Sequence, residues 1–415
     1  MSNAFTWVFL AALASALATR LWLAARQTRH VRAHRGAVPV SFAGTIPLAA
    51  HQKAADYTVT RTRFGMVEAC VSATLVLALT FGGLLQRLSD AWSGAAAPGG
   101  MAHGVALIVS VVVVLSLAEL PLILYRTFVI EARFGFNRMT PELFAIDLAK
   151  QTLISAALGI PLLALVLWLM AQMGGLWWIW VWFAWTVFNL LVLLIYPSLI
   201  APLFNKFSPL ADRALAERIE SLLARCGFRS SGLYVMDGSR RSSHGNAYFT
   251  GFGAAKRIVF FDTLLSRLAP GEVEAVLAHE LGHFKRHHVW KRVAVLFAAS
   301  FALLWVLGRL IGEAWFYAGL SVSTQSTATA LLLFVLATPA FTFFLQPLTS
   351  LYSRRHEFEA DAYAVRHADS SELVKALVKL YTDNAATLTP DPVHSAFYDS
   401  HPPAATRIAR LQAGA

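Results

Sequence analysis

Two histidines and a glutamate in residues 272–290 form the pattern His-Glu-x-x-His, as His279, Glu280 and His283. On a helix, residues four apart lie about one turn apart on one face, so both imidazoles can converge on one metal ion. Glu280 lies roughly 100° around the helix from His279, which suits a carboxylate beside a water better than a third ligand. The pattern therefore predicts one tetrahedral zinc ion per chain, with an open position for water and Glu280 as general base.

The residues around this pattern favour a helix. Pro270 and Gly271 mark its start, and Glu272 and Glu274 complement the positive end of the helix dipole. An apolar face is supplied by Val273, Val276, Leu277 and Leu281. The alternative interpretation is a surface helix whose two histidines are solvated.

Two further histidines follow the pattern and compete for the role of third ligand. His287 lies eight residues beyond His279, about 12 Å along a helix axis at 1.5 Å per residue, which is too far to share one ion. His288 points to another face, and the spacing is not that of the metzincins. We therefore predict that both belong, with Lys285 and Arg286, to a basic membrane-facing end, and that the third ligand comes from elsewhere.

A second helical pattern near the C-terminus offers that ligand. Glu357 and Asp361 are four residues apart and share a face, whereas Glu359 falls away from it. We expect Glu357 to supply an oxygen to the metal and Asp361 to accept a hydrogen bond from the far nitrogen of a ligating histidine. His356 lies about 100° from Glu357 and ranks below it as a ligand. The alternative is a solvated acidic face.

Residues 201–290 are predicted to form a small mixed α/β segment. A helical period covers 211–226, and strand-like runs cover 233–236, 246–252 and 257–261. A peptidase must hold its substrate extended beside the metal, and an exposed strand can do this by backbone pairing. Asn246, Ala247 and Tyr248 are the candidates for such an edge, and an ordinary paired strand is the alternative.

The composition indicates an integral membrane protein. The 415 residues are 57% hydrophobic and only 14% charged, which is unusual for a soluble chain of this length. Seven stretches are long and apolar enough to cross about 30 Å of hydrocarbon. They run approximately over 4–25, 64–86, 103–125, 152–172, 176–197, 291–311 and 328–348.

The basic residues predict the orientation of these spans. Lys and Arg are frequent in the loops 26–63, 126–151 and 198–290 and absent from 88–102, 173–175 and 312–327. This alternation places the N-terminus outside and the large polar segment and the C-terminus in the cytoplasm. The net charge of +11 is then a topology signal, and we expect no nucleic-acid partner.

Some ionisable residues inside the spans or after the last span are further candidates for functional residues. Glu119 lies in the third span, where it faces either a wet cavity or an interhelical hydrogen bond. Near the C-terminus, His401 could help to hold the oxyanion of a tetrahedral intermediate, with Arg407 as a charge donor. A helix start with a surface histidine is the simpler interpretation of that cluster.

Together these motifs resemble the integral-membrane zinc metallopeptidases known as type I CAAX prenyl proteases. The resemblance covers most of the chain and keeps the family's order. It includes FGFN at 134–137, APLFNKF at 201–207, HGNAYFTGF at 244–252, HELGH at 279–283, SRRHEFEAD at 353–361 and SHPP at 400–403.

The resemblance implies roles for the residues already singled out. It makes His279, His283 and Glu357 the zinc ligands, Glu280 the general base, and Asp361 a supporting carboxylate that is sometimes described as a proton donor. Further members of the implied site are the substrate-pairing Asn246, Ala247 and Tyr248, and His401 and Arg407 near the cleaved bond. The family's helices enclose a water-filled chamber facing the metal, which would give Glu119 a wet neighbour.

We therefore expect a mainly α-helical multi-pass membrane protein with seven transmembrane helices and a small α/β zinc peptidase domain of gluzincin type. Four parts are expected. They are 1–200 with five membrane helices, 201–290 with the cytoplasmic α/β segment and the His-Glu-x-x-His helix, 291–350 with membrane helices six and seven, and 351–415 with the third ligand.

The expected activity is zinc-dependent hydrolysis of peptide bonds near the cytoplasmic membrane face, with removal of a C-terminal tripeptide after a prenylated cysteine. The partners would be a peptide or lipidated protein and the lipid bilayer. Eukaryotic family members act in the endoplasmic reticulum. This chain has no dilysine-type tail and looks like a bacterial relative, which predicts the bacterial inner membrane. Two alternatives are a quality-control protease for unprenylated membrane proteins, and a multi-pass transporter with a structural metal site.

Overall fold

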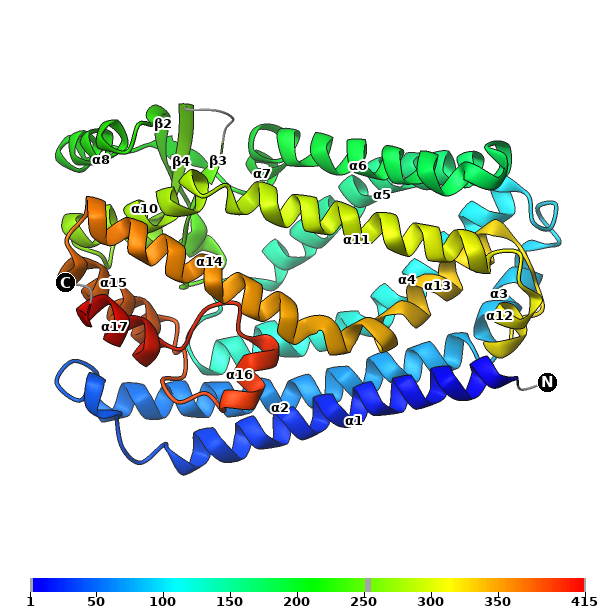
Figure 1. Cartoon of the computed structure of the whole chain (residues 1–415), viewed down its shortest axis with the longest axis horizontal. Helices are drawn as coiled ribbons and strands as arrows, with labels where there is room; N and C mark the ends of the chain where they lie inside the picture. The colour runs from blue at the N-terminus through cyan, green and yellow to red at the C-terminus, as the bar shows by residue number, and fades with distance from the viewer. Residues whose placement is uncertain (1–2, 251–254, 414–415) are drawn as a thin grey trace.

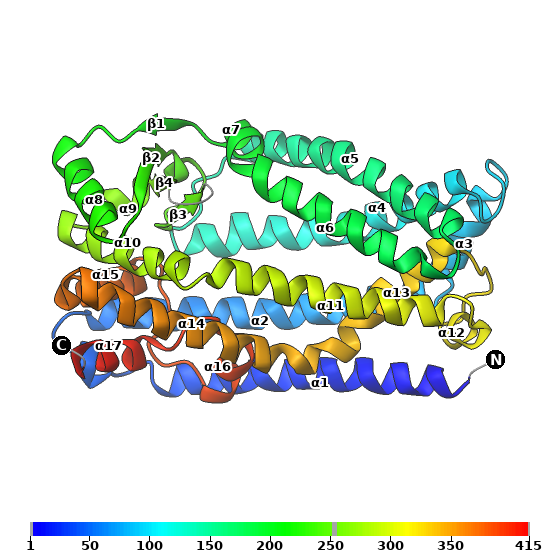
Figure 2. The ribbon, with the colours of Figure 1, turned by 45° about the horizontal axis from the view of Figure 1, so that its top comes forward.

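The structure, a computed structural model, describes residues 3–250 and 255–413. Long helices run side by side along the longest dimension, and a small sheet with several shorter helices occupies one end (Figure 1 and Figure 2). The N-terminus lies at the opposite end from the sheet, and the C-terminus lies near the sheet (Figure 1).

Seven helical segments of the described chain are long and apolar enough to span a membrane, which confirms the predicted number. Most are single helices or helices extended by short 3₁₀ or π segments. They are α1 Ala4–Ala33, α2 Leu48–Leu79, α4 Met101–Tyr125 with η2 Arg126–Glu131, α5 Pro141–Gln172, η3 Gly174–Leu176 with α6 Trp177–Ile195, η4 Tyr196–Ile200 and α7 Ala201–Phe204, α11 His288–Leu310, and α13 Thr327–Thr342 with η6 Phe343–Leu345 and α14 Gln346–His367.

The seventh segment is much longer than the predicted 328–348. Pro339 and Pro347 flank the 3₁₀ turn η6, and the chain then continues directly into α14. The helix thus carries Glu357 and Asp361 out of the membrane-spanning part without a loop. This continuity fixes the distance between the bilayer and the candidate third ligand.

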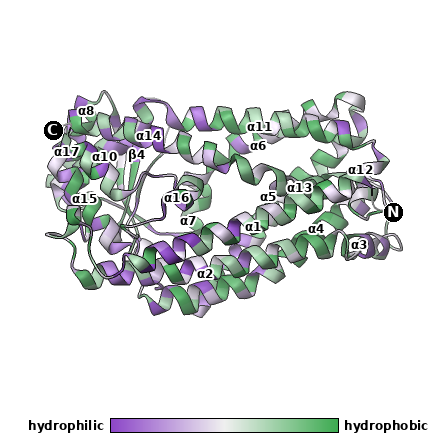
Figure 3. Ribbon diagram, turned by 60° about the horizontal axis from the view of Figure 1, so that its bottom comes forward, coloured by the Kyte–Doolittle hydropathy of each residue, from purple (hydrophilic) through white to green (hydrophobic). Residues whose placement is uncertain are grey.

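The outer surfaces of the spans are those of a lipid-facing protein. Large apolar side chains are exposed along them, such as Leu153 at 70%, Leu117 at 63% and Phe183 at 59%. Apolar residues dominate along the spans, whereas hydrophilic residues gather toward the end that carries the sheet (Figure 3). Burying these side chains in lipid tails instead of water is favourable, so this arrangement requires a membrane.

The sheet has four strands in the order β1-β2-β4-β3, so β3 lies at an edge. Strands β2 and β4 are parallel, whereas β1–β2 and β3–β4 are antiparallel. The three predicted strands are present, β1 was not predicted, and residues 251–252 of the predicted 246–252 strand lie outside the described residues. The strands are β1 Phe207–Pro209, β2 Arg229–Met236, β3 Ala247–Thr250 and β4 Ala255–Phe261.

Shorter helices complete the domain around the sheet and cap the far end of the spans. Helices α8, α9, α10, α15 and α17 contribute apolar residues to one core with the sheet, in which Ile219 of α8, Phe260 of β4 and Leu281 of α10 are fully buried. Helices α3 and α12 instead pack on the core between the membrane spans. These helices are α3 Leu84–Trp92, α8 Arg213–Arg225, α9 Asp262–Leu265, α10 Pro270–Lys285, α12 Ala314–Gly319, α15 Ser370–Asp383, α16 Pro392–Tyr398 and α17 Ala404–Ala413, with 3₁₀ turns η1 Val40–Phe42 and η5 Gly238–Arg240.

Candidate metal centre

Helix α10 carries the His-Glu-x-x-His pattern and starts where the sequence predicts. Pro270 occupies its first turn, and the Glu272 carboxylate accepts the N–H of Ala269 at 2.7 Å, which satisfies a free donor at the helix start. Lys379 of α15 binds the same carboxylate at 2.7 Å. With its apolar face in the core of the sheet domain, the helix holds His279 and His283 on one fixed side.

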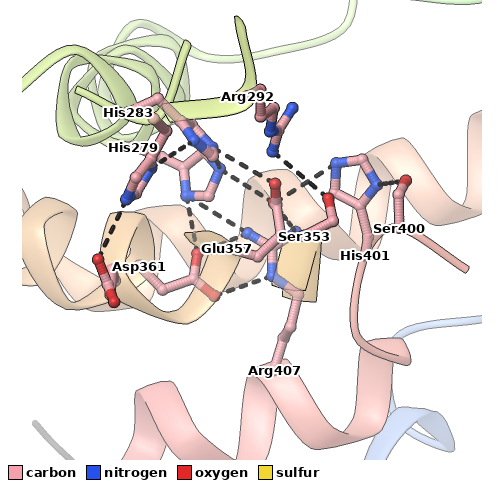
Figure 4. A network of polar contacts seen from close by, with 11 residues as sticks. His279, His283, Arg292, Ser353, Glu357, Asp361, Ser400, His401 and Arg407 are labelled. Atoms are coloured by element: carbon pink, nitrogen blue, oxygen red, sulfur yellow. Dashed lines mark hydrogen bonds and ion pairs between the residues drawn. The ribbon is translucent and has the colours of Figure 1, made fainter. Parts of the chain in front are cut away.

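A close approach between α10 and α14 brings the third candidate ligand to these histidines. Gly282 lies against α14, and a Cβ at this position would be 3.0 Å from the Cα of Ala360 and 3.0 Å from the Cβ of Tyr363. A side chain at this position would require the two helices to separate by a few tenths of an ångström. Glu357, one turn before that contact, therefore faces the two imidazoles (Figure 4).

Three donor atoms converge at this point. Nε2 of His279 and Nε2 of His283 lie 3.3 Å apart, and each lies 3.4 Å from a carboxylate oxygen of Glu357. All three ligand atoms lie within 4.8 Å of one another. These donors, two imidazole nitrogens and one carboxylate oxygen, are the set found in catalytic zinc sites that keep one position open.

The environment of Glu357 also fits a bound cation. Its Oε2 atom is buried and accepts no hydrogen bond from the described residues. The Nε2 atoms of His279 and His401 lie 3.4 Å from it, too far for good hydrogen bonds. A buried carboxylate oxygen without a donor is costly, and a metal ion between the three side chains would remove that cost. The residues present therefore fit the predicted metal.

Glu280 occupies a different position from the three candidate ligands. It is only partly exposed, and its carboxylate makes no hydrogen bond or ion pair with the described residues. Burial raises the pKa of the Glu280 carboxyl. A carboxylate with a raised pKa and free oxygens beside a metal site is suited to accept a proton.

The far side of the His279 ring is held by a carboxylate. Its Nδ1 lies 2.8 Å from Oδ1 of Asp361, and Arg407 holds the same carboxylate through Nε at 2.9 Å and Nη2 at 2.5 Å. Although burial disfavours the charged ring, the carboxylates of Asp361 and Glu357 raise the pKa of His279 to about 9. Asp361 thus keeps a hydrogen on Nδ1 and leaves Nε2 to face the metal position.

The C-terminal cluster reaches the site from the loop before α17. Nε2 of His401 lies 3.4 Å from Oε2 of Glu357, and its Nδ1 contacts the Ser400 hydroxyl at 3.0 Å. The side chain of His401 is 62% exposed, so it is accessible to a bound molecule. Arg407 is buried and directed at Asp361, with Nη1 4.0 Å from Glu357. His401 is therefore accessible from outside, whereas Arg407 is not.

The prediction for His288 is wrong. It is 1% exposed and its Nδ1 lies 3.0 Å from Nδ1 of His283, whereas His287 is exposed as predicted. His287 has φ 57, in the left-handed region, and this residue separates the end of α10 from the start of α11. Because no glycine or proline marks the turn, the sequence suggested one uninterrupted helix. Glu359, which was set aside, contacts His288 at 3.1 Å.

Strand β3 runs beside the same site. The ring of Phe249 lies 5.5 Å from that of Phe284 on α10, and a cavity of about 830 Å³ is lined by Tyr248, Phe249 and His283 among others. The N–H of Phe261 bonds the carbonyl of Asn246 at 3.0 Å. Since bonded pairs alternate along an antiparallel ladder, the backbone groups of Ala247 and Phe249 face away from β4.

A polar cluster that the sequence did not single out anchors the chain just before β3. His244 contacts Asn384 at 2.9 Å and stacks on Phe136 with ring centroids 4.5 Å apart. Its Nε2 lies 3.7 Å from Glu131, which in turn accepts the hydroxyl of Tyr57 at 2.6 Å. These contacts connect the edge strand to helices α2 and α4. Of this cluster, only Phe136 and His244 lie in the motifs 134–137 and 244–252, which were the available signal.

Glu119 lies on the wall of a cavity of about 610 Å³ between α1, α2, α4 and α13. Arg20, Glu68 and Arg126 line the same cavity, and Arg126 forms an ion pair with Glu68. Glu119 makes no hydrogen bond or ion pair with the described residues. Of the two alternatives, the position facing a cavity is therefore the one observed.

Two family models match the chain and together cover nearly all of it. Residues 27–206 match the model described as CAAX prenyl protease N-terminal, five membrane helices, and residues 209–415 match peptidase family M48.

Curated proteins with similar sequences extend over most of the chain. A CAAX prenyl protease 1 homolog of Arabidopsis thaliana is 34% identical over 381 residues, 89% of each protein. The Homo sapiens homolog is 32% identical over 453 residues, covering 98% of this chain and 95% of the relative. The CAAX prenyl protease 1 of Saccharomyces cerevisiae is 37% identical over 314 residues, covering 71% and 69%.

A solved structure has the same fold. The crystal structure of S. mikatae Ste24p matches with a TM-score of 0.90 and 29% sequence identity, and the match covers 99% of both chains. The long helices, the small sheet and the C-terminal helices therefore recur together in one solved protein.

Proposed function

Because this chain belongs to peptidase family M48 and carries the N-terminal membrane helices of the CAAX prenyl proteases, we propose that His279, His283 and Glu357 bind one Zn²⁺ in a membrane metallopeptidase of that type. The observation that carries the assignment is the convergence of the three donor atoms within 4.8 Å, two of them on the helix of Glu280, whose carboxylate has no hydrogen bond or ion pair in the part of the chain that the structure describes. A multi-pass transporter with a structural metal site would have no use for that free base.

In the proposed reaction, Zn²⁺ supplies Lewis-acid polarisation of the scissile carbonyl and makes water more acidic. Glu280 accepts a proton from the attacking water as its oxygen forms a bond to the carbonyl carbon. Glu280 then returns the proton to the leaving nitrogen as the C–N bond breaks, so the products are a carboxylic acid and an amine. We assign to His401, whose Nε2 lies 3.4 Å from Oε2 of Glu357, the donation of a hydrogen bond to the developing oxyanion.

Asp361 and Arg407 act through His279 rather than on the substrate. The Asp361 carboxylate accepts a hydrogen bond from His279 Nδ1, which keeps Nε2 free as a ligand, and Arg407 holds that carboxylate in place. Removing Arg407 would leave a buried negative charge next to the metal centre. We therefore assign both as positioning residues.

The substrate backbone is proposed to pair with the edge of β3 that faces away from β4, where the N–H of Ala247 now donates to Oδ1 of Asn246 at 2.8 Å. Asn246 precedes this edge, and the outward backbone groups of Ala247 lie on the strand that borders the site. An extended peptide can add to such an edge through main-chain hydrogen bonds, and this pairing does not depend on which side chains the peptide carries. Tyr248 lines the adjoining cavity and is placed to contact substrate side chains.

We propose a prenylated C-terminal CAAX sequence as the substrate, cut so that a tripeptide is released. The names of the relatives from plants, yeast and human support this choice. The cavity of about 830 Å³ also supports it, because it joins β3 and His283 to Leu193 and Trp290 on spans whose side chains are exposed. An apolar chain could therefore lie between the metal centre and the lipid.

The active site is proposed to face the cytoplasm. The sheet domain lies at the end of the molecule that carries the Lys- and Arg-rich loops, which remain on the cytoplasmic side of membranes. That the membrane is the inner membrane of a bacterium stays a prediction from the sequence.

One experiment tests activity and substrate class together. The purified enzyme is incubated with a farnesylated CAAX peptide or with an unprenylated membrane peptide, and the products are identified by mass spectrometry. We expect tripeptide release from the farnesylated peptide, loss of this activity with a zinc chelator, and recovery when Zn²⁺ is restored. Equal cleavage of the unprenylated peptide would instead favour a quality-control protease, and cleavage that resists zinc removal would refute the proposed metal centre.

A further inference from the structure

The ring of His283 has a polar contact on the side that faces away from the metal centre. Its Nδ1 lies 3.0 Å from Nδ1 of His288, and Nε2 of His288 lies 3.1 Å from Oε2 of Glu359. The first contact joins α10 to α11, and the second joins α11 to α14. A chain of side chains therefore runs from a candidate metal ligand to a carboxylate on the helix that also carries Glu357.

When His283 binds a metal, the hydrogen bonds among His283, His288 and Glu359 can run in one direction only, with His283 donating to His288 and His288 donating to Glu359. An ionised Glu359 can only accept, so Nε2 of His288 carries the hydrogen that points to it. In a neutral ring, Nδ1 of His288 is then an acceptor, and it can be satisfied only by a hydrogen on Nδ1 of His283. This leaves the lone pair of His283 on Nε2, which is the atom that faces His279 and Glu357.

The packing around His288 keeps this arrangement rigid. The ring of His356 stacks on it with centroids 4.0 Å apart and planes 8° apart, and Tyr352 packs edge-on against His356 at 4.2 Å. Arg355 binds the other oxygen of Glu359 at 3.3 Å. His287 holds a left-handed conformation, which residues other than glycine adopt uncommonly. This turn separates α10 from α11, whose first residue is His288.

We propose that His288 and Glu359 are positioning residues that hold His283 in the tautomer able to bind the metal. They would do for His283 what Asp361 does for His279, but through an intervening imidazole instead of directly. The inference rests on the proposed zinc centre and adds two residues to it. Removing a side chain that orients a ligating histidine typically weakens metal binding by about 10- to 100-fold.

Paired substitutions separate hydrogen bonding from packing. His288→Phe keeps a ring that can stack on His356 but removes both hydrogen bonds, whereas His288→Gln keeps one acceptor and one donor. Glu359→Leu removes the terminal acceptor, and Glu359→Gln keeps an oxygen that can accept. The full-length proteins are purified without metal, and the dissociation constant for Zn²⁺ is measured by competition with a chromophoric chelator.

We expect His288→Phe to weaken Zn²⁺ binding about 10- to 100-fold and His288→Gln to recover most of the affinity. The visible absorption of the Co²⁺-substituted protein should change in the Phe variant and resemble wild type in the Gln variant. In the His288→Phe background, Glu359→Leu should add little, because the two residues act as one unit. His287→Asn, an exposed neighbour that tolerates the left-handed conformation, is the control and should keep wild-type affinity.

Wild-type affinity with an unchanged Co²⁺ spectrum in His288→Phe would overturn the proposal, as would fully additive losses in the double variant. Thermal unfolding of the metal-free proteins checks that the variants fold, and if His288→Phe does not, the comparison of Glu359→Leu with Glu359→Gln decides the question. His283→Ala tests the zinc centre separately. If it still binds Zn²⁺ as wild type does, the centre itself is refuted; if it loses Zn²⁺ while His288→Phe keeps it, only the positioning role fails.

Discussion

At the scale of single residues, the carboxylates around the metal centre differ in their partners. Asp361 is held by His279 and Arg407, and Glu359 by His288 and Arg355. Glu280 has neither a hydrogen bond nor an ion pair among the described residues. An unpaired carboxylate at a partly buried position is costly for folding, which argues that its freedom serves the reaction.

Glu280→Gln should therefore abolish peptide hydrolysis while leaving metal binding intact. The amide has nearly the same shape but cannot accept the proton of water, and general base catalysis contributes about 10²- to 10⁴-fold. We expect kcat to fall by at least about 100-fold, with zinc content by metal analysis equal to wild type. Glu217→Gln, an exposed acid-to-amide change on α8, is the control. Wild-type cleavage by Glu280→Gln would refute the assigned base.

At the scale of elements, the metal centre depends on how closely α10 and α14 pack. Both helices supply ligands, so any shift between them changes the distance from Glu357 to the two imidazoles. Gly282 sets that separation, because the atoms it contacts belong to the backbone and Cβ positions of α14 and cannot rotate away. A metal site needs its ligands held within a few tenths of an ångström.

Gly282→Ala should thus weaken both folding and metal binding. The added methyl would meet Ala360 and Tyr363 at 3.0 Å, and overpacking of this kind costs about 1–3 kcal/mol. We expect a lower unfolding temperature and weaker Zn²⁺ binding in the same variant. Gly159→Ala in α5 adds the same methyl where nothing lies within 4 Å, so it should not reduce either quantity. Equal behaviour of the two variants would contradict this account of the helix contact.

The edge strand β3 is the second element on which activity should depend. Ala247→Pro removes a backbone N–H from the outward side of the strand, which donates to Oδ1 of Asn246 at 2.8 Å and which a bound peptide would have to take over. The hydrogen bonds of β3 to β4 do not involve this N–H. Loss of one hydrogen bond costs about 0.5–1.5 kcal/mol, so we expect kcat/KM to fall by about 2- to 13-fold. The affinity for Zn²⁺ should not change. Ala247→Gly keeps the N–H and should retain more activity than the proline variant. The opposite order would argue against backbone pairing at this strand.

At the scale of the whole molecule, the C-terminal segment closes the site onto the membrane helices. Arg26 of α1 binds Asp391 through Nε at 3.2 Å and Nη2 at 3.0 Å, and Gln27 accepts the Asp391 N–H at 2.7 Å. Ser350 of α14 donates to the carbonyl of Phe397 at 2.8 Å. The first span and the last helices therefore hold one another, although they are separated by most of the sequence.

The orientation in the membrane gives a prediction at this scale. Single cysteines are introduced at Ala97, in the loop without Lys or Arg, and at Ala37, in a basic loop, in a background that lacks Cys70 and Cys226. Because basic loops stay in the cytoplasm, an impermeant maleimide should label Ala97→Cys on intact cells. Ala37→Cys should react only after permeabilisation. The reverse pattern would place the sheet domain on the outside.

The sequence by itself determined the class of protein and the chemistry to look for. Hydropathy identifies the seven spans because every backbone group inside lipid must be bonded within a helix, which needs about 20 apolar residues each time. The spacing of His279 and His283, and of Glu357 and Asp361, indicates which side chains share a helix face, since helical periodicity is local. These features are readable because they depend only on near neighbours in the chain.

Only the tertiary structure decided what surrounds those side chains. The meeting of α10 with α14 joins residues about 80 positions apart in sequence, and no local pattern encodes that distance. The position of His288 follows a left-handed turn at His287, which the sequence does not mark with glycine, and its partner Glu359 lies on the distant helix α14. Burial of Arg407 against Asp361 likewise follows from the packing of α17. Contacts between distant segments are decided by the balance of packing and hydrogen bonding over the whole fold, which no single stretch of sequence determines.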